Sequence, residues 1–505
     1  MVVTEISITF VTSPNKYNMT FAKNQQFENL IDAMMIEEVA GLDSTLKTKL
    51  QGLPIDKKRI GILSILDKDR GLFMKIYNKI NDNNISKTDY IKHLVEMLRE
   101  YVKVGDFERK QHGEVQTPVE LVQKILNKLP KDVWSNPNLK WLDNSTGTGI
   151  FIACIVERLM VGLDIFESDD QRYKYIMENM IYVSELQSKN CFLYLVSFDP
   201  KDEYSINIYN GSFLDDKFDN HCNDVWGVDK FDIVVMNPPY NQMLDMAFIK
   251  KSHEISDITL CIHPSTWLID EKNIQKKFTS TKELVKDDLI SIELFNGNGV
   301  FGISLFVPCV ITYINKNQTH TGIKCIDRIN GVELVYDNTD DINKFSNVDV
   351  YPKLKNKLIE LCKDNNLNKI IKTQEDKTYF VNLAQIRGHV KDTNKLGLGM
   401  DSDMLVDDFY TMVTKDLEIS LESKQQPVSF ASEVEARNFL GYIKTNFVRF
   451  CLSIYKNNGN LHRGELALTP WLDFTQEWTD KKLYSNFNLS QEEMAFIEKV
   501  IPKYY

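Results

Sequence analysis

Short apolar runs alternate with helix-length segments through the middle of the chain, and this pattern predicts an α/β domain with a mostly parallel sheet. Each run ends in polar or turn-forming residues, as buried strands do. The runs that predict strands lie at 141–143, 181–183, 206–209, 233–236 and 259–263, and a further pair is expected at 291–295 and 306–314. Ligand sites in open sheets of this kind lie at the carboxyl ends of the strands.

The flanking parts of the chain have different patterns. Residues 1–108 predict a mainly helical domain, because Ser86 and Asp89 can cap a helix with apolar residues at helical spacing over 91–98. Beyond about residue 320 the alternation of strand and helix is lost. We therefore predict three parts, which are an N-terminal helical domain (1–108), an α/β domain (109–318) and a C-terminal region of different pattern (319–505).

The predicted strand at 233–236 ends in Asn237-Pro238-Pro239-Tyr240. Two prolines cannot continue a sheet ladder, and they stiffen the loop because each fixes φ and lacks an N–H. The Asn237 side-chain oxygen and the Pro238 carbonyl can both accept hydrogen bonds from one planar NH₂ group, and Tyr240 offers a ring on which a flat heterocycle can stack. The loop suits the amino group of a base, although a chance Pro-Pro turn after a core strand would have the same spelling.

A glycine-rich turn follows the first predicted strand. Asp143 ends that strand, and the turn with Gly147 and Gly149 leads into an apolar helix over 150–160. Glycines in such a strand-turn-helix unit let the backbone approach a nucleotide closely, so a Rossmann-like unit is expected. Glu185 follows the second strand, where a carboxylate can accept both hydroxyls of a ribose; a plain surface carboxylate is the alternative.

Net charge, cysteine content and hydrophobicity indicate which classes of protein the chain can belong to. The 505 residues carry a net charge of −11, so nucleic acid would have to bind to a local basic face. The eight cysteines form no CxxC pair, and we expect reduced core thiols and no metal site. No segment predicts a membrane span or a secretion signal, which favours a cytoplasmic protein without membrane contact.

One more segment precedes the glycine loop. Thr117 is expected to cap a helix that starts at Pro118, with Glu120 completing a capping box. The spelling Gly113-Glu114-x-x-Thr117-Pro118 also resembles the segment that precedes the cofactor loop in one class of DNA adenine methyltransferases.

With the Asn-Pro-Pro-Tyr loop, the order of these segments over about 109–316 resembles gamma-class DNA adenine-N6 methyltransferases, including methylases of the Eco57I type in restriction-modification systems. The resemblance implies a Rossmann-like S-adenosylmethionine-dependent fold. It also implies methyl transfer from S-adenosylmethionine to N6 of an adenine flipped out of double-stranded DNA. A separate restriction endonuclease is a further partner in such systems, and the sequence leaves its existence open.

The resemblance also assigns residues to roles. Asn237, Pro238, Pro239 and Tyr240 form the catalytic loop, with Tyr240 and Phe301 stacking on the base; Phe301 could instead fill the core. The residues it assigns to the cofactor are Thr117, Pro118, Asp143, Gly147, Gly149, Phe151, Glu185, Ser212 and Phe213. Asn144 and Ser145 depart from the family's loop, and Ser212 replaces an acid that would hold the cofactor's adenine.

The C-terminal region contains candidate DNA contacts, which are Arg387, His389 and Lys391. Polar and basic side chains on loops can pair with phosphates and read base edges. Other functions remain open at this point: an RNA adenine methyltransferase, a protein glutamine-N5 methyltransferase that uses the same loop on a planar amide, or a catalytically silent DNA-binding module. The choice between adenine N6 and cytosine N4 and the recognition sequence also stay open.

Overall fold

The computed structural model describes most of the chain and divides it into two units, Met1–Cys261 and Ile262–Tyr505. The described residues are 26–37, 39, 42–67, 71–80, 85–103, 117–269, 276–301, 308–371, 379–382, 384–385, 409–410, 413–414, 427–455 and 463–501. The two units are taken in turn below.

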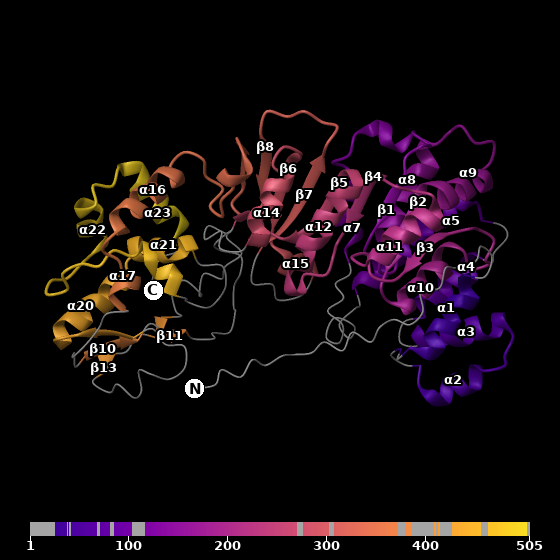
Figure 1. Ribbon diagram of the computed structural model, residues 1–505, viewed down its shortest axis with the longest axis horizontal. Coiled ribbons are helices and arrows are strands. Elements are labelled where there is room, and N and C mark those ends of the chain that lie inside the picture. The colour runs from indigo at the N-terminus through magenta and orange to yellow at the C-terminus, as the bar shows by residue number, and fades with distance from the viewer. Residues whose placement is uncertain are drawn as a thin grey trace. The chain divides into compact units, whose positions relative to one another are not determined.

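The first unit is built on parallel strands in the order β3-β2-β1-β4-β5 (Figure 1). Each strand is a short apolar run, and β1, β2 and β4 are almost entirely buried because helices cover both faces. The strands are β1 (Trp141–Asp143), β2 (Ile181–Glu185), β3 (Asn207–Asn210), β4 (Phe231–Met236) and β5 (Ser256–Pro264). All five were predicted from the sequence to within a few residues.

Helices fill the connections between these strands and precede them. They are α1 (Gln26–Ile36), α2 (Ser44–Leu50), α3 (Ile55–Leu66), α4 (Leu72–Ile80), α5 (Lys87–Lys103), α7 (Val119–Leu126), α8 (Ile150–Gly162), α9 (Asp169–Tyr175), α10 (Ser188–Phe198), α11 (Asp216–His221) and α12 (Leu244–Ile255). Two π-helical turns, Ile176–Met180 and Cys222–Trp226, follow α9 and α11.

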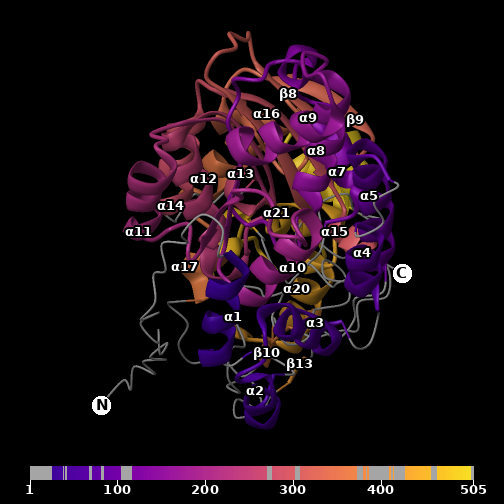
Figure 2. The same ribbon diagram turned by 90° about the vertical axis from the view of Figure 1, so that its right-hand side faces the viewer.

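The N-terminal helices pack against the sheet-covering helices of the same unit. α5 lies beside α7 and α8 (Figure 2), and its predicted apolar face of Ile91, Leu94, Val95 and Leu98 is buried. The Tyr90 hydroxyl donates to the carbonyl of Ser197 on α10, 2.6 Å away. The predicted cap is present, with the amide of Asp89 3.1 Å from Ser86 Oγ. The predicted domain boundary near residue 108 falls within 104–116, outside the described residues.

The second unit begins in the last residues of β5 and has strands in the order β7-β6-β8-β9. β6 (Leu289–Phe295) runs antiparallel to β7 (Cys309–Asn315) and parallel to β8 (Ile323–Asp327), and β9 (Val332–Tyr336) pairs antiparallel with β8. The strand pattern therefore continues past residue 320, where the sequence predicted that it would be lost. Short helices accompany these strands, namely α13 (Thr266–Ile269), α14 (Lys276–Val285) and α15 (Gly297–Phe301).

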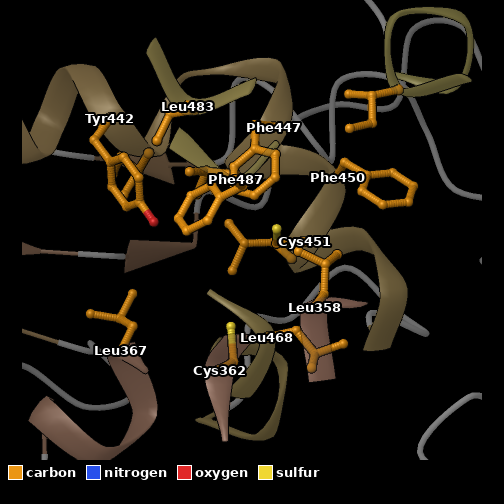
Figure 3. Close-up of a cluster of buried hydrophobic side chains, with 14 of the residues drawn as sticks. Leu358, Cys362, Leu367, Tyr442, Phe447, Phe450, Cys451, Leu468, Leu483 and Phe487 are labelled. Carbon is orange, nitrogen blue, oxygen red and sulfur yellow. The ribbon is translucent and has the colours of Figure 1, made fainter. Parts of the chain in front are cut away.

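A second core lies in the C-terminal part of this unit (Figure 3). Phe447, Phe450 and Cys451 of α21 (Asn446–Tyr455) pack with Leu358 and Cys362 of α16 (Tyr351–Cys362). The other α-helices and strands among the described residues of this part are α17 (Leu367–Ile371), α20 (Glu433–Ile443), α22 (Asp480–Asn486), α23 (Gln491–Val500), β10 (Tyr379–Asn382), β11 (Ala384–Gln385), β12 (Phe409–Tyr410), β13 (Val413–Thr414) and β14 (Pro427–Phe430). The α23 helix begins with a capping box formed by Ser490 and Glu493.

Three further findings bear on the sequence predictions. All eight cysteines are buried and none is in a disulfide, as expected for reduced core thiols. In the described part of the chain, no helix is both long enough and apolar enough to cross a membrane. The same residues contain no group of three or more His, Cys, Asp or Glu side chains arranged to hold a metal ion.

Candidate active site

The strand order brings the predicted site loops together at one edge of the first unit's sheet. β1 lies between β2 and β4, and the chain proceeds from β1 outward to β3 on one side and from β4 to β5 on the other. This reversal is a topological switch point, where loops at the carboxyl ends of neighbouring strands diverge and leave room for a ligand. The glycine loop after β1 and the Asn-Pro-Pro-Tyr loop after β4 flank that point.

The glycine loop needs its glycines at two positions. Gly147 and Gly149 have φ values of 53° and 90°, in the left-handed region that other residues rarely adopt. A Cβ at Gly149 would lie 2.7 Å from ring atoms of Tyr194 and Phe198, whereas a Cβ at Gly147 would meet no atom within 4 Å. Gly149 therefore allows the start of α8 to pack closely on α10, and Gly147 leaves open space beside the loop. Phe151, the predicted aromatic in α8, is buried.

Two carboxylates hold the glycine loop. Glu185, at the end of β2, accepts the Gly147 amide through Oε2 and the Gln187 amide through Oε1, both at 2.8 Å. Asp143 accepts the Ser145 amide at 3.2 Å and the Thr146 hydroxyl at 3.1 Å. Burial raises the pKa of Asp143 to about 7, which the nearby Glu185 reinforces and these two hydrogen bonds oppose.

Two polar atoms of the same loop are buried and have no hydrogen-bond partner among the described residues, namely Asn144 Oδ1 and Ser145 Oγ. Buried polar groups are nearly always paired, so these atoms indicate a place where a bound molecule or water completes the bonding. Together with the two acidic side chains and the open space at Gly147, they suit a ligand that carries positive charge, hydroxyls and an amine. S-adenosylmethionine has these groups, and the loop residues fit it.

Asn144 also forms a contact that the sequence did not indicate. Its Nδ2 donates to Ser252 Oγ of α12 at 2.8 Å and lies 3.5 Å from the sulfur of Met236, the last residue of β4. The glycine loop is thereby tied to the strand and the helix on either side of the Asn-Pro-Pro-Tyr loop. Ser252 is a polar residue at a buried position of α12, a kind of position where helical spacing favours apolar side chains. This exception to the pattern is the sequence signal that could have identified it.

The Asn-Pro-Pro-Tyr loop leaves β4 as predicted. Asn237 is half-buried, Pro238 is buried and Pro239 is exposed. The Asn237 amide has a partner on each side: Nδ2 donates to Thr117 Oγ1 at 2.9 Å, and Oδ1 accepts the Tyr240 hydroxyl at 2.6 Å. After the loop, Gln242 and Met243 have φ values of 54° and 59°, so strained backbone connects the loop to α12.

The structure corrects the helix cap predicted at Thr117. α7 begins at Val119 with Pro118 at the N-cap position, and no side chain caps it. The Thr117 hydroxyl is instead engaged with Asn237, across 120 positions of sequence. Glu120 does not complete a capping box, and its carboxylate lies 3.0 Å from Arg99 of α5. Thr117 is buried beside the Asn-Pro-Pro-Tyr loop, which a local motif could not reveal.

The remaining predicted residues occupy three different settings. Ser212 accepts the Leu214 amide at 3.3 Å, and Phe213 is buried against Phe218 and Phe248, with ring centroids 5.0 and 5.1 Å apart. Phe301 ends the short helix α15 in the second unit, buried with its ring 6.3 Å from that of Phe295. This packing is the core position that the sequence left open as an alternative to base stacking. Arg387, His389 and Lys391 lie outside the described residues.

Comparisons with known proteins agree with this arrangement. Residues 88–267 match the model of the N-6 DNA Methylase family. A protein described as an uncharacterized adenine-specific methylase of Mycoplasma pneumoniae is 26% identical over 265 residues, covering 36% of this chain and 62% of that protein. The chain thus spans less than two thirds of the length of this relative.

The solved structures that the comparison found include a putative class I S-adenosylmethionine-dependent methyltransferase from Listeria monocytogenes, with 14% identity, a TM-score of 0.36 and coverage of 60% of this chain and 93% of that one. A modification subunit of a putative type I restriction enzyme from Vibrio vulnificus has 16% identity, a TM-score of 0.36 and coverage of 49% and 54%. The first unit has a Rossmann-like parallel sheet, and residues 88–267 are similar to the N-6 DNA methylase family.

Proposed function

We propose that the protein is a DNA methyltransferase that transfers a methyl group from S-adenosylmethionine to N6 of adenine in double-stranded DNA. The observation that carries this proposal is the Asn237–Tyr240 loop at the carboxyl end of β4, next to the glycine loop at the end of β1. The family match over residues 88–267 spans both loops. The gamma-class assignment is part of the proposal and rests on the order of the Thr117-Pro118 segment, the glycine loop and the Asn-Pro-Pro-Tyr loop.

The proposed substrate amine is a poor nucleophile, because its lone pair is delocalised into the base. Hydrogen bonds from the amine to Asn237 Oδ1 and the Pro238 carbonyl would favour the tetrahedral nitrogen that develops as the methyl group arrives. The base must first leave the duplex, since pairing and stacking hide its amine. Tyr240, on the same loop, would stack on the extruded ring.

In the structure the Tyr240 hydroxyl donates a hydrogen bond to Asn237 Oδ1, which is the atom that would accept the hydrogen bond from the substrate amine. Entry of the base therefore replaces one hydrogen bond to Asn237 Oδ1 with another, so the carbonyl oxygen is paired both before and after binding. Release of the phenol also frees the Tyr240 ring to take up its stacking position. No strong base is required, because the methylated amine is acidic and loses its proton readily.

When bound, S-adenosylmethionine supplies an electrophilic methyl group on a positively charged sulfur. We assign Asp143 and Glu185 to the polar groups of this cofactor, with the Gly147 backbone beside it and the Phe213 ring near its adenine. Thr117, Pro118, Gly149, Phe151 and Ser212 complete the predicted cofactor site. The proposal that Ser212 replaces an acid implies weaker binding of the cofactor's adenine amine.

DNA recognition is assigned to the C-terminal region, with Arg387, His389 and Lys391 as candidate contacts. A separate restriction endonuclease is the partner that a restriction-modification system would add.

The test is transfer of labelled methyl from S-adenosylmethionine to unmodified duplex DNA, followed by nucleoside analysis. N6-methyladenine is the expected product. Transfer to RNA or to a protein glutamine in place of DNA would overturn the substrate assignment while keeping the cofactor and the loop.

A further inference from the structure

The amide of Asn237 has two chemically opposite ends, and only one of them suits the proposed reaction. Its oxygen accepts hydrogen bonds, whereas its NH₂ group donates them. The substrate amine is a donor, so it needs the oxygen. A rotation of the amide by half a turn would place a donor against a donor and remove the favourable interaction.

Thr117 holds the NH₂ end. Its Oγ1 accepts from Asn237 Nδ2 at 2.9 Å, and the hydroxyl is buried, with 4% of the residue exposed. With the NH₂ group engaged there, Oδ1 faces the Tyr240 hydroxyl at 2.6 Å. The NH₂ end of the amide is thus bound by a residue outside the Asn-Pro-Pro-Tyr loop.

The structure around Thr117 fixes its position. Pro118 follows directly, which restricts the backbone of the preceding residue to extended conformations. α7, which begins one residue later, is bound to α8 by Arg158, whose guanidinium donates to the Gln123 carbonyl at 3.1 Å and to Asn127 Oδ1 at 2.8 Å. Since α8 starts at the glycine loop, Thr117 is anchored to the same helix that carries the cofactor loop.

We infer that Thr117 is a positioning residue whose hydroxyl orients the Asn237 amide so that its oxygen faces the amine of the base. This inference rests on the proposed function and adds a role for Thr117 beyond the cofactor contact that the family resemblance implies. Threonine is suited to the task, because its side chain is short, its χ1 angle is stiff and its hydroxyl can accept while buried.

Two substitutions separate the hydroxyl from the shape of the side chain. Thr117→Val keeps the branched shape and removes the acceptor, so the amide loses the bond that orients it. Thr117→Ser keeps the acceptor and removes a methyl group. Loss of one hydrogen bond of this kind predicts a decrease in kcat of about 3- to 10-fold for the valine variant, with kcat largely restored in the serine variant.

The experiment measures single-turnover methyl transfer to duplex DNA and, separately, S-adenosylmethionine binding by calorimetry. Thr259→Val is the matched control, because Thr259 is equally buried in the first unit and its hydroxyl lies 3.0 Å from Ser256 Oγ, not near Asn237. A double-mutant cycle with Asn237→Ala supplies the decisive readout, since a residue that acts only through Asn237 has no effect once that side chain is gone.

The expected result, with S-adenosylmethionine at saturation, is a slower rate for Thr117→Val in the wild-type background, no further loss in the Asn237→Ala background and normal transfer by Thr259→Val. Equal rates for Thr117→Val and wild type would overturn the inference. So would an additive loss in the cycle, or a loss that disappears as the cofactor concentration is raised. Failure of the wild-type protein to methylate DNA at all would instead refute the proposed function.

Discussion

Replacing Gly149 by alanine tests how tightly the glycine loop is built. The substitution has two costs, because the residue has φ of 90° and because the new Cβ would lie 2.7 Å from Tyr194 and Phe198. A left-handed conformation costs a residue with a side chain about 1–2 kcal/mol, and overpacking a core costs about 1–3 kcal/mol. The sum is about 2–5 kcal/mol. Gly147→Ala has only the first cost, since its Cβ would meet nothing within 4 Å.

The assay is amide hydrogen exchange read on peptides from α8 and α10, which reports local opening free energies in this unit. We expect Gly149→Ala to lower the opening free energy of α8 by about 2–5 kcal/mol and Gly147→Ala by about 1–2 kcal/mol. Peptides of α16 and α21 in the second unit serve as internal controls and should be unchanged. Equal protection of α8 in the two variants would show that the predicted contact with the aromatic rings does not limit the loop.

Three further predictions address the site. Burial raises the pKa of Asp143 to about 7, and a cation bound beside this carboxyl group is stabilised by its ionised form. The affinity for S-adenosylmethionine, measured by calorimetry, should therefore increase as the pH rises through 7 and then level off. The Asp143→Asn variant should show a weaker dependence of this affinity on pH. The Tyr240→Phe variant keeps the ring, and its kcat should stay within about 3-fold of the wild-type value. The Tyr240→Ala variant loses the stacking interaction, and its KM for DNA should rise by about 10- to 100-fold. Equal effects of the two substitutions would refute a stacking role. Filter binding at several salt concentrations gives the slope of the logarithm of the DNA-binding constant against the logarithm of the salt concentration. Arg387→Ala and Lys391→Ala should each reduce the magnitude of this slope by about one unit. An unchanged slope would show that these two residues do not contact DNA phosphates.

The parallel strands could be predicted because each is a short apolar run with a turn at its end. Val234 and Val235 illustrate this: both are fully buried between helices, so the whole strand must be apolar. The edge of the sheet that carries the site also followed from the sequence, since Asp143, Glu185 and Asn237 each come at or directly after the end of a strand. At these three positions, the apolar pattern of the strands and the general rule for ligand sites in parallel sheets are sufficient to predict where the side chains lie.

Contacts between distant segments could not be predicted in the same way. Thr117 has the sequence of a helix cap, and its hydroxyl is used by Asn237 because the fold brings the two together. Glu120 pairs with Arg99 for the same reason. Asn144 departs from the family's loop, and only the structure shows that its amide binds Ser252. The sequence shows which hydrogen bonds and ion pairs each of these side chains can form, whereas the fold decides which residue is the partner.

The most direct test of the proposed function compares wild-type protein with Asn237→Ala in methyl transfer to unmodified duplex DNA, with cofactor binding measured on both. Loss of the hydrogen-bond acceptor should lower the rate by about 10²-fold or more while S-adenosylmethionine still binds. We predict N6-methyladenine from the wild type and this large loss from the variant. Near-normal transfer by Asn237→Ala would contradict the catalytic role of the loop, and absence of transfer by a wild-type protein that binds the cofactor would contradict DNA as the substrate.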